Sequence, residues 1–283
     1  MAAAIGRVCR TIFYSAATRI LPSRIAAFGG HWWGARILSG VQLAFGGGSV
    51  TIAGGAAGRL LLDTDYLLIG HPQGYGLVRG LVEPSVQEAM RRHIAPGATV
   101  YDVGGDIGFF SILSARLTGP DGRVESFEPV PASAKAVAAN AKLNGFTNVR
   151  VHDVAVSDHD GAGTLLIQTD RTWSHLADRG PSLRTRDRVD VALVSLDAQI
   201  ASGAIPPPDL IKIDVEGSEI AVLQGLTQTL RSRAPTIICE LHETNREILE
   251  LLDQHGYSAE NLDGTIPIAD AGPVHILARP RTV

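Results

Sequence analysis

Short runs of β-branched and aromatic residues recur along the chain, and apolar residues at helical spacing follow most of them. These runs predict buried strands at 99–103, 123–127, 149–152, 210–213 and 236–239. Helical spacing follows at 109–117, 131–144, 220–230 and 244–255, and Thr244 and Glu247 predict a capping box for the last of these helices. The repeated order of strand and helix is typical of a doubly wound, mostly parallel α/β sheet. The last apolar run, 274–278, is expected to return antiparallel as an edge strand.

The first 79 residues follow a different pattern. Residues 2–21 place apolar side chains at helical spacing with arginines on another side, and the glycine-rich stretch around 41–52 predicts a small hairpin. Three interpretations of the helix stay open: a helix lying on an anionic membrane, a cleaved transit peptide, or a helix packed on the core. We therefore expect an N-terminal extension at 1–79 and a catalytic domain at 80–283.

The stretch Thr99 to Phe110 combines the central predicted strand with a glycine turn and the start of a helix. Gly104, Gly105 and Gly108 allow a sharp turn and a close approach of the backbone to a ligand. The spacing is D-x-G-x-x-x-G, beginning at Asp102, and differs from the G-x-G-x-x-G of dehydrogenases. The pattern predicts a nucleotide-cofactor cradle, although an ordinary strand-to-helix turn would have the same local features.

Acidic residues stand at the ends of all five predicted parallel strands. They are Asp102, Glu128, Asp153, Asp214 and Glu240. Ligands of doubly wound sheets bind at the carboxyl ends of the strands, and an acid at the tip of the second strand can accept both hydroxyls of a ribose. With no P-loop lysine in the cradle, this set suits S-adenosylmethionine, which carries an ammonium, a sulfonium and a ribose, better than a phosphate-bearing ligand.

Four successive segments resemble the motifs of the FkbM-type methyltransferases. They are DVGGDIGFFS, FEPVPAS, LIKIDVEGSEIAVLQGL and IICELH, and the similarity runs from about Gly80 to about Ala278. The resemblance implies a class I, Rossmann-like, seven-stranded sheet and an S-adenosylmethionine-dependent O-methyltransferase. It also implies that Tyr75 and Glu83, on and after a turn-rich loop at 71–76, border the methionine end of the cofactor, and that Val154 and Ala155 lie against the adenine. Asp153, at the tip of the third predicted strand, could accept a hydrogen bond from the exocyclic amine of the adenine or be a solvated loop carboxylate.

The chain departs from the family at Gly105-Asp106, where Ala-Asn is common. The added carboxylate of Asp106 could be neutral, hold a metal or weaken cofactor binding. The third outcome would favour a catalytically impaired protein of this fold that acts as a membrane- or partner-binding module.

Methyl transfer to a hydroxyl needs a group that removes the proton of the acceptor. Candidate bases are Asp214, Glu216, Glu240 and His242, which follow two adjacent predicted strands. His242 has the best unperturbed pKa for this task, whereas a carboxylate would need burial to raise its own. A second hypothesis places Mg²⁺ on Asp214, Glu240 and Asp106, although carboxylate spacing alone does not identify a metal site.

Residues 169–188 show little apolar periodicity and predict an irregular loop beside the acceptor. Trp173 and His175 are the candidate substrate residues, and the five arginines of the loop favour an anionic or lipid-phosphate-linked acceptor. The expected acceptor is a hydroxyl of a glycan, a glycolipid or another small metabolite. Nucleic acid is disfavoured because the catalytic region is acidic and lacks the Asn/Asp-Pro-Pro-aromatic motif of amino-methylating enzymes.

Charge and composition refine this picture. Residues 1–62 contain six arginines and no acid, so a total net charge of -4 leaves -10 for the remainder. With 45% hydrophobic residues but no apolar run of about 18 residues, the chain is expected to be cytoplasmic, with peripheral membrane contact through residues 1–28 as one interpretation of the basic end. Cys9 and Cys239 make neither a zinc spacing nor a disulfide framework. The sequence leaves a homo-oligomer open.

Overall fold

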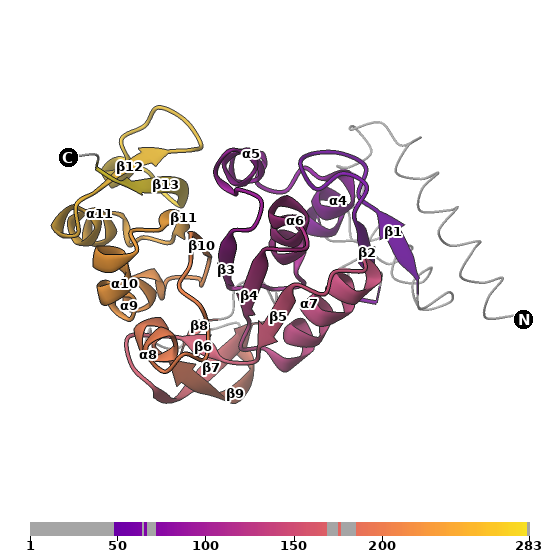
Figure 1. The fold of residues 1–283 in the computed structure, drawn as a ribbon, viewed down its shortest axis with the longest axis horizontal. Helices are drawn as coiled ribbons and strands as arrows, with labels where there is room; N and C mark the ends of the chain where they lie inside the picture. The colour runs from indigo at the N-terminus through magenta and orange to yellow at the C-terminus, as the bar shows by residue number, and fades with distance from the viewer. Residues whose placement is uncertain (1–47, 64, 67–71, 169–174, 177–184, 282–283) are drawn as a thin grey trace, which may run out of the picture.

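A seven-stranded, mostly parallel sheet forms the centre of the protein (Figure 1). The computed structural model describes residues 48–63, 65–66, 72–168, 175–176 and 185–281. The strand order is β12-β13-β11-β10-β3-β4-β5. The strands are β3 (Thr99–Val103), β4 (Arg123–Phe127), β5 (Val149–His152), β10 (Leu210–Ile213), β11 (Thr236–Leu241), β12 (Tyr257–Asn261) and β13 (Val274–Pro280). The predicted α/β class I architecture is confirmed.

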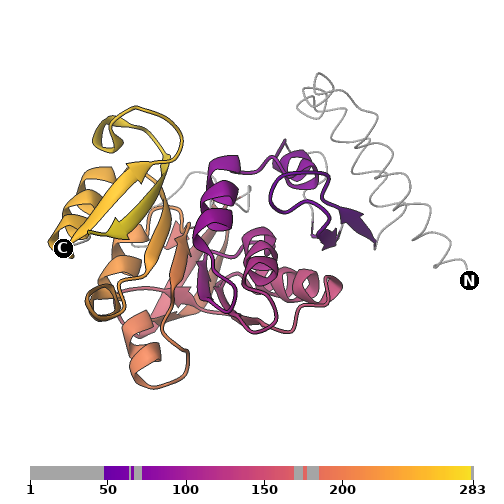
Figure 2. The ribbon, with the colours of Figure 1, turned by 45° about the horizontal axis from the view of Figure 1, so that its top comes forward.

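The C-terminal strands differ in one respect from the prediction. Strand β13 is antiparallel to β11, as expected, but it is not the edge strand, because β12 pairs on its outer side. The run Tyr257–Asn261 alternates buried and more exposed side chains, so its apolar pattern was too weak to predict a strand. In Figure 2 the yellow C-terminal strands lie at the opposite end of the molecule from the indigo hairpin of β1 and β2.

Helices on both faces of the sheet enclose two apolar cores. One core joins α5 (Pro84–His93), α6 (Phe109–Thr118) and α7 (Pro131–Leu143) to one face of the strands. The other joins α8 (Leu196–Ala201), α9 (Glu219–Gln224), α10 (Thr227–Ser232) and α11 (Asn245–Gln254) to the opposite face. Leu210 lies in the first core and Ile211 in the second, which explains why successive residues of β10 are apolar on both faces of the sheet.

The helix predicted at 220–230 is broken into α9 and α10 at Gly225. A Cβ at this glycine would lie 2.1 Å from the backbone oxygen of Ser157. The missing side chain at Gly225 therefore lets the segment after Val156 pass close to the backbone at this break. A single helical pattern in the sequence could not reveal this close approach.

The described part of the N-terminal extension packs on the first core. Strand β1 (Ser49–Thr51) pairs antiparallel with β2 (Leu61–Asp63), and their side chains Val50 and Leu62 are fully buried. The predicted partner strand at 41–45 and the amphipathic helix at 2–21 lie outside the described residues. The loop predicted at 71–76 is wrong, because Pro72–Arg79 forms helix α4. Proline suits a first helical turn, and Val78 buries its side chain in the core despite the glycines.

A second sheet of four strands, in the order β6-β9-β7-β8, follows β5. Its strands are β6 (Ala155–Val156), β7 (Gly161–Gln168), β8 (His175–Leu176) and β9 (Thr185–Val194). The prediction of an irregular segment at 169–188 is therefore wrong at 175–176 and 185–188. Arg188 lies opposite Leu166 in the antiparallel pairing of β9 with β7. This pairing makes the charged stretch at the start of β9 a strand although it lacks apolar periodicity. Trp173 lies outside the described residues.

Candidate active site

The glycine turn after β3 brings three elements into direct contact. Gly104 has φ 87, and a Cβ there would lie 1.8 Å from the backbone oxygen of Asp214 at the end of β10. Gly108 has φ 88, and a Cβ there would lie 2.9 Å from the Cα of Val137 on α7. Only glycine satisfies both the positive φ and the closeness. The turn therefore places the end of β10 against the predicted cofactor cradle.

The departure at Gly105-Asp106 fits the packing of this chain. A Cβ at Gly105 would lie 2.5 Å from Ser126 Oγ, which already lies within hydrogen-bond distance of Ser111 Oγ at 2.9 Å. Asp106 is exposed and has φ 44, a left-handed conformation that both Asn and Asp adopt readily. The backbone of the turn is therefore compatible with Gly-Asp in place of Ala-Asn.

Asp102 is a completely buried carboxylate at the end of β3. Its Oδ2 accepts a hydrogen bond from Ser111 Oγ at 2.5 Å, while its Oδ1 has no hydrogen-bond partner. Burial raises the pKa of this carboxyl group. Within the described residues, Asp102 thus offers an unused acceptor beside the glycine turn.

Lys212, opposite Asp102 in the register of β10 and β3, is a buried cation. Its Nζ lies 3.1 Å from Asp214 Oδ2 and 4.6 Å from the centroid of the Phe110 ring. Burial alone would raise the pKa of Asp214, but the ammonium of Lys212 outweighs it and holds the pKa below its usual value. Asp214 is therefore a weak base.

Glu128 reaches back from the end of β4 to the glycine turn. Its Oε2 accepts from the Asp106 N–H and its Oε1 from the Val130 N–H, both at 2.8 Å. Burial raises the pKa of this carboxyl group to about 8, although the two backbone hydrogen bonds oppose the shift. At the next strand end Asp153 is exposed and Ala155 is buried in β6.

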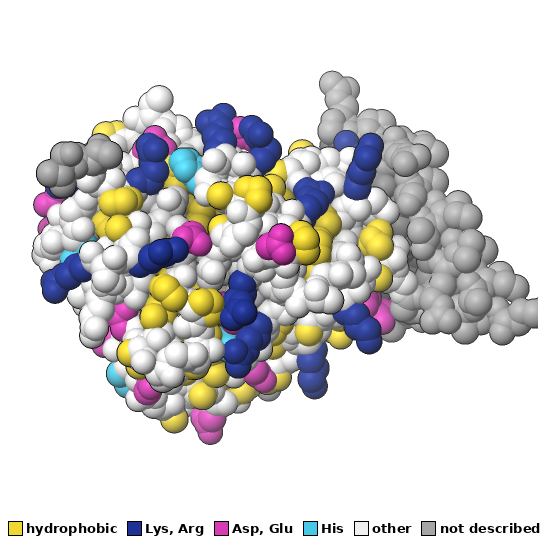
Figure 3. All heavy atoms as spheres, viewed as in Figure 1, with side chains coloured by type: hydrophobic (Ala, Val, Ile, Leu, Met, Phe, Trp, Pro, Cys, Tyr) yellow, Lys and Arg dark blue, Asp and Glu magenta, His cyan; other side chains and the backbone are white. Residues whose placement is uncertain are grey.

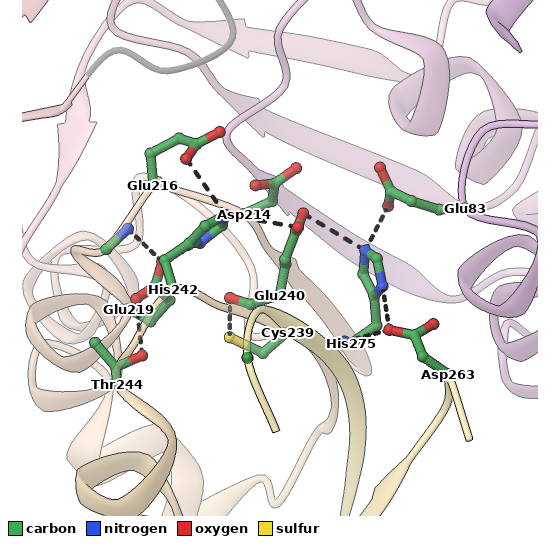
Figure 4. Close-up of polar contacts among 12 residues, drawn as sticks. Glu83, Asp214, Glu216, Glu219, Cys239, Glu240, His242, Thr244, Asp263 and His275 are labelled. Carbon is green, nitrogen blue, oxygen red and sulfur yellow. Dashed lines mark hydrogen bonds and ion pairs between the residues drawn. The ribbon is translucent and has the colours of Figure 1, made fainter. Parts of the chain in front are cut away.

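His242 joins three carboxylates at the ends of β10 and β11 (Figure 4). Its Nδ1 lies 3.0 Å from Glu219 Oε1, and its Nε2 lies 3.3 Å from Glu216 Oε2 and 3.5 Å from Glu240 Oε1. Burial alone would lower the pKa of His242, but the hydrogen bond with Glu219 and the charges of Glu216 and Glu240 raise it to about 9. Burial also raises the pKa of Glu216 to about 8.

A second imidazole, His275 on β13, extends this cluster through Glu240. Its Nε2 lies 3.4 Å from Glu83 Oε2 and 3.5 Å from Glu240 Oε2, while its Nδ1 lies 2.8 Å from Asp263 Oδ2. Burial alone would lower the pKa of His275. The hydrogen bonds and charges of Glu240 and Glu83 outweigh burial and raise this pKa to about 11. Figure 4 shows Glu240 between the two imidazoles.

The predicted site residues are brought together in part. Asp214, Glu216, Glu240 and His242 form one cluster, and Glu83 joins it through His275. Tyr75 lies in α4 and His175 in β8, but the side chains of both, like Trp173 as a whole, lie outside the described residues. No local pattern distinguishes His275, whereas Glu219 stands within the IDVEGSE segment, where it also begins helix α9.

Two groups of side chains could hold a divalent cation. Asp214, Glu240 and His242 form one, and Glu83, Glu240 and His275 form the other, each with three ligand atoms within 4.8 Å of one another. Asp106, which the sequence hypothesis included with Mg²⁺, belongs to neither group among the described residues. The Mg²⁺ hypothesis stays a prediction.

Comparison with known proteins identifies the family. Residues 102–259, more than half of the chain, match the methyltransferase FkbM domain. The chain belongs to the FkbM methyltransferase family. It is 30% identical over 219 residues to 31-O-demethyl-FK506 methyltransferase FkbM of Streptomyces tacrolimicus, covering 67% of this chain and 83% of that protein. It is 27% identical over 164 residues to hexuronic acid methyltransferase AglP of Haloferax volcanii, covering 57% of this chain and 64% of that protein.

The solved structures that this chain resembles are more distant in sequence. Methyltransferase FkbM from Methylobacillus flagellatus is 16% identical with a TM-score of 0.43, covering 77% of this chain and 56% of that chain. An O-methyltransferase from Bacillus cereus in complex with SAH is 17% identical with a TM-score of 0.46, covering 71% of this chain and 82% of that chain.

The family match covers the cradle and the cluster around His242, but not His275 or Glu83, which lie outside residues 102–259. No helix in the described part of the chain is long and apolar enough to cross a membrane. On the face seen in Figure 3, Lys and Arg side chains are scattered among acidic, apolar and uncharged groups. This described face carries no continuous basic track.

The raised pKa values predict a pH-dependent stability. Glu128, Glu216, His242 and His275 all bind protons more tightly in the folded state than at their usual pKa values of 4.5 or 6.5. Their stabilising contribution is complete below those usual values and is lost as the pH rises through the folded values of about 8 to 11. The urea midpoint of unfolding should therefore fall between pH 6 and pH 9.

In His242→Gln the same fall should be shallower above pH 6.5, because one of the four groups no longer titrates. A midpoint that stays constant or rises from pH 6 to pH 9 in the unaltered protein would contradict this assignment of protons. The lowered pKa values of Asp214 and Asp263 act in the opposite direction, but at acid pH only.

Proposed function

We propose that the protein is an S-adenosylmethionine-dependent O-methyltransferase that acts on a hydroxyl of a glycan, a glycolipid or another small metabolite. The observation that carries this proposal is the contact between Gly104 and the end of β10, which sets the cradle beside the Asp214, Glu216, Glu240 and His242 cluster. Both FkbM and AglP are named as methyltransferases, the latter of a hexuronic acid.

The residues of the cradle fit S-adenosylmethionine. The unused Oδ1 of Asp102 is an acceptor for an ammonium, and the carboxylate of Glu128 is an acceptor for ribose hydroxyls. The positive φ values of Gly104 and Gly108 keep side chains out of the turn. When bound, the cofactor supplies an activated methyl group on a sulfonium sulfur.

His242 is the group best placed to take the proton of the acceptor. Lys212 holds the pKa of Asp214 below its usual value, and Glu216 directs an oxygen to Nε2 of His242 at 3.3 Å. Glu240 contacts His242 through Oε1 and His275 through Oε2, so both of its oxygens already face an imidazole. Once neutral, His242 accepts the hydroxyl proton on Nε2, and a base placed in this way contributes roughly 10²–10⁴-fold in rate.

The acceptor side of the cluster is rich in carboxylate oxygens. Glu83, Glu216 and Glu240 present them near the two imidazoles, and carboxylates accept hydrogen bonds from several hydroxyls at once. The described residues therefore support a polyhydroxylated acceptor such as a sugar. The arginines that favoured an anionic group lie mostly outside the described residues, as do residues 1–28, so peripheral membrane contact stays a prediction.

A direct assay tests the proposal. The full chain is incubated with methyl-labelled S-adenosylmethionine and a panel of neutral sugars, uronic acids, glycolipids and amines. Label should transfer to oxygen of at least one hydroxyl acceptor, with formation of S-adenosylhomocysteine. Tight cofactor binding without transfer to any acceptor, or transfer to nitrogen, would contradict the proposal, and the first result would support the non-catalytic alternative.

A further inference from the structure

We propose that Glu219 is a positioning residue, which fixes the orientation and the tautomer of His242 so that Nε2 is the nitrogen that exchanges a proton. This inference rests on the proposed function for its catalytic meaning. The geometry that supports it is present in the protein alone.

Glu219 is a carboxylate with no exposed surface at the start of α9. Its Oε1 accepts a hydrogen bond from the Gly217 N–H at 2.5 Å and lies 3.0 Å from His242 Nδ1. Its Oε2 accepts from Thr244 Oγ1 at 3.1 Å. Donors from the turn after β10 and from the segment after β11 thus hold one buried charge against the imidazole.

Thr244 hydrogen-bonds to Glu219 and does not form the predicted N-terminal cap of helix α11. Thr244 and Glu247 have the spacing of a capping box for α11, but Thr244 makes no side-chain cap hydrogen bond in the structure. Its hydroxyl donates to Glu219 instead. The capping-box prediction is therefore wrong, because a buried carboxylate competes successfully for the hydroxyl proton.

The arrangement decides which nitrogen titrates. Carboxylates face both nitrogens of His242. Among the described residues, Nδ1 makes a hydrogen bond with Glu219 Oε1 at 3.0 Å, whereas Nε2 has only ion-pair contacts with Glu216 and Glu240 at 3.3 and 3.5 Å. The hydrogen bond favours the proton on Nδ1, since a carboxylate is an acceptor only. Nε2 then carries the lone pair, and it points toward Glu216 and Glu240, on the side where the acceptor is proposed to bind. As the acceptor oxygen bonds to the methyl carbon, the bond between that carbon and the sulfonium sulfur would break and leave its electron pair on sulfur, while the O–H bond of the acceptor breaks and its proton moves to Nε2. The charge of Glu219 stabilises the resulting imidazolium, which later releases the proton to water.

A purely structural role for Glu219 would have different consequences. Holding the turn at 216–219 against the segment after β11 would affect folding and would leave the proton affinity of His242 unchanged. The positioning role couples the charge of Glu219 to that affinity. The protonation of His242 is therefore the decisive readout, and it needs neither cofactor nor acceptor.

The first experiment is an NMR titration of ¹⁵N-labelled histidine in the full chain. Above the pKa of His242, the nitrogen shifts should show a proton on Nδ1 and none on Nε2. A neutral form with the proton on Nε2 overturns the proposal. Because this measurement uses the unaltered protein without substrates, its failure is separate from a failure to find methyl transfer.

The second experiment compares Glu219→Gln with Thr244→Val. Removing the buried charge should weaken proton binding by His242 at least tenfold and shift the rise of kcat with pH to lower pH. The plateau of kcat should fall at least tenfold, with KM for both substrates changed less than threefold. Thr244→Val keeps the charge and should change proton binding less than threefold.

An unchanged proton affinity of His242 in Glu219→Gln would overturn the proposal. If this variant does not fold, Glu219→Asp provides the same comparison, because a shorter carboxylate keeps the charge but withdraws it from Nδ1. Proton binding by His242 should then weaken by at least threefold. A value equal to that of the unaltered protein again contradicts a positioning role.

Discussion

Glu128→Ala should lower the affinity for S-adenosylmethionine about 100-fold or more. The carboxyl group lies buried at the end of β4, where its pKa is about 8. Hydrogen bonds from both ribose hydroxyls would favour its ionised form, and hydrogen bonds to a charged group contribute roughly 1.5–3 kcal/mol each. Its removal also leaves the N–H groups of Asp106 and Val130 without their side-chain acceptor. The turn that forms the cradle would lose part of its support.

Isothermal titration calorimetry of the two proteins measures this effect. Glu88→Ala serves as the matched control, because Glu88 pairs only with Arg91 and Arg92 on α5 and should leave the affinity unchanged. Circular dichroism checks that Glu128→Ala is folded. Equal affinity of the variant and the unaltered protein would contradict the assignment of Glu128 to the ribose.

His242→Gln should lower kcat by roughly 10²–10⁴-fold while changing cofactor affinity little. Glutamine keeps a polar group of similar reach but cannot accept a proton near neutral pH. In the unaltered protein kcat should rise as the pH increases from 7 toward 9, because the pKa of His242 is about 9 and only the neutral imidazole is a base. The variant should lose this rise.

Single-turnover kinetics over pH 6 to 10 measures both effects. His159→Gln is the control, since His159 is exposed and pairs with Asp158 away from the cluster. A kcat in His242→Gln within threefold of the unaltered value would mean that one of the neighbouring carboxylates, Glu216 or Glu240, is the base.

Much of the fold follows from local patterns. The strands at 99–103, 123–127, 149–152 and 210–213 have the predicted bounds, because short runs of β-branched and aromatic residues bounded by turn residues are typical of strands. The acids at their tips could be predicted to meet, since the carboxyl ends of parallel strands share one edge of the sheet. The cradle and the cluster around His242 are consequences of that rule.

The partners of these residues depend on the tertiary structure. His275 reaches Glu240 because the antiparallel register of β13 on β11 sets the two residues opposite each other, and nothing in the local pattern specifies a register between strands 35 positions apart. In the same way, Lys212 lies beside Asp102 only through strand pairing.

Thr244 shows most clearly that local sequence spacing does not determine every hydrogen bond of a side chain. Its sequence spacing predicts a helix cap, yet its hydroxyl bonds to Glu219, which is 25 positions away. Local spacing determines which hydrogen bonds a side chain can make with its own helix. Burial of a distant carboxylate, which only the folded chain creates, decides which of the available hydrogen bonds is formed.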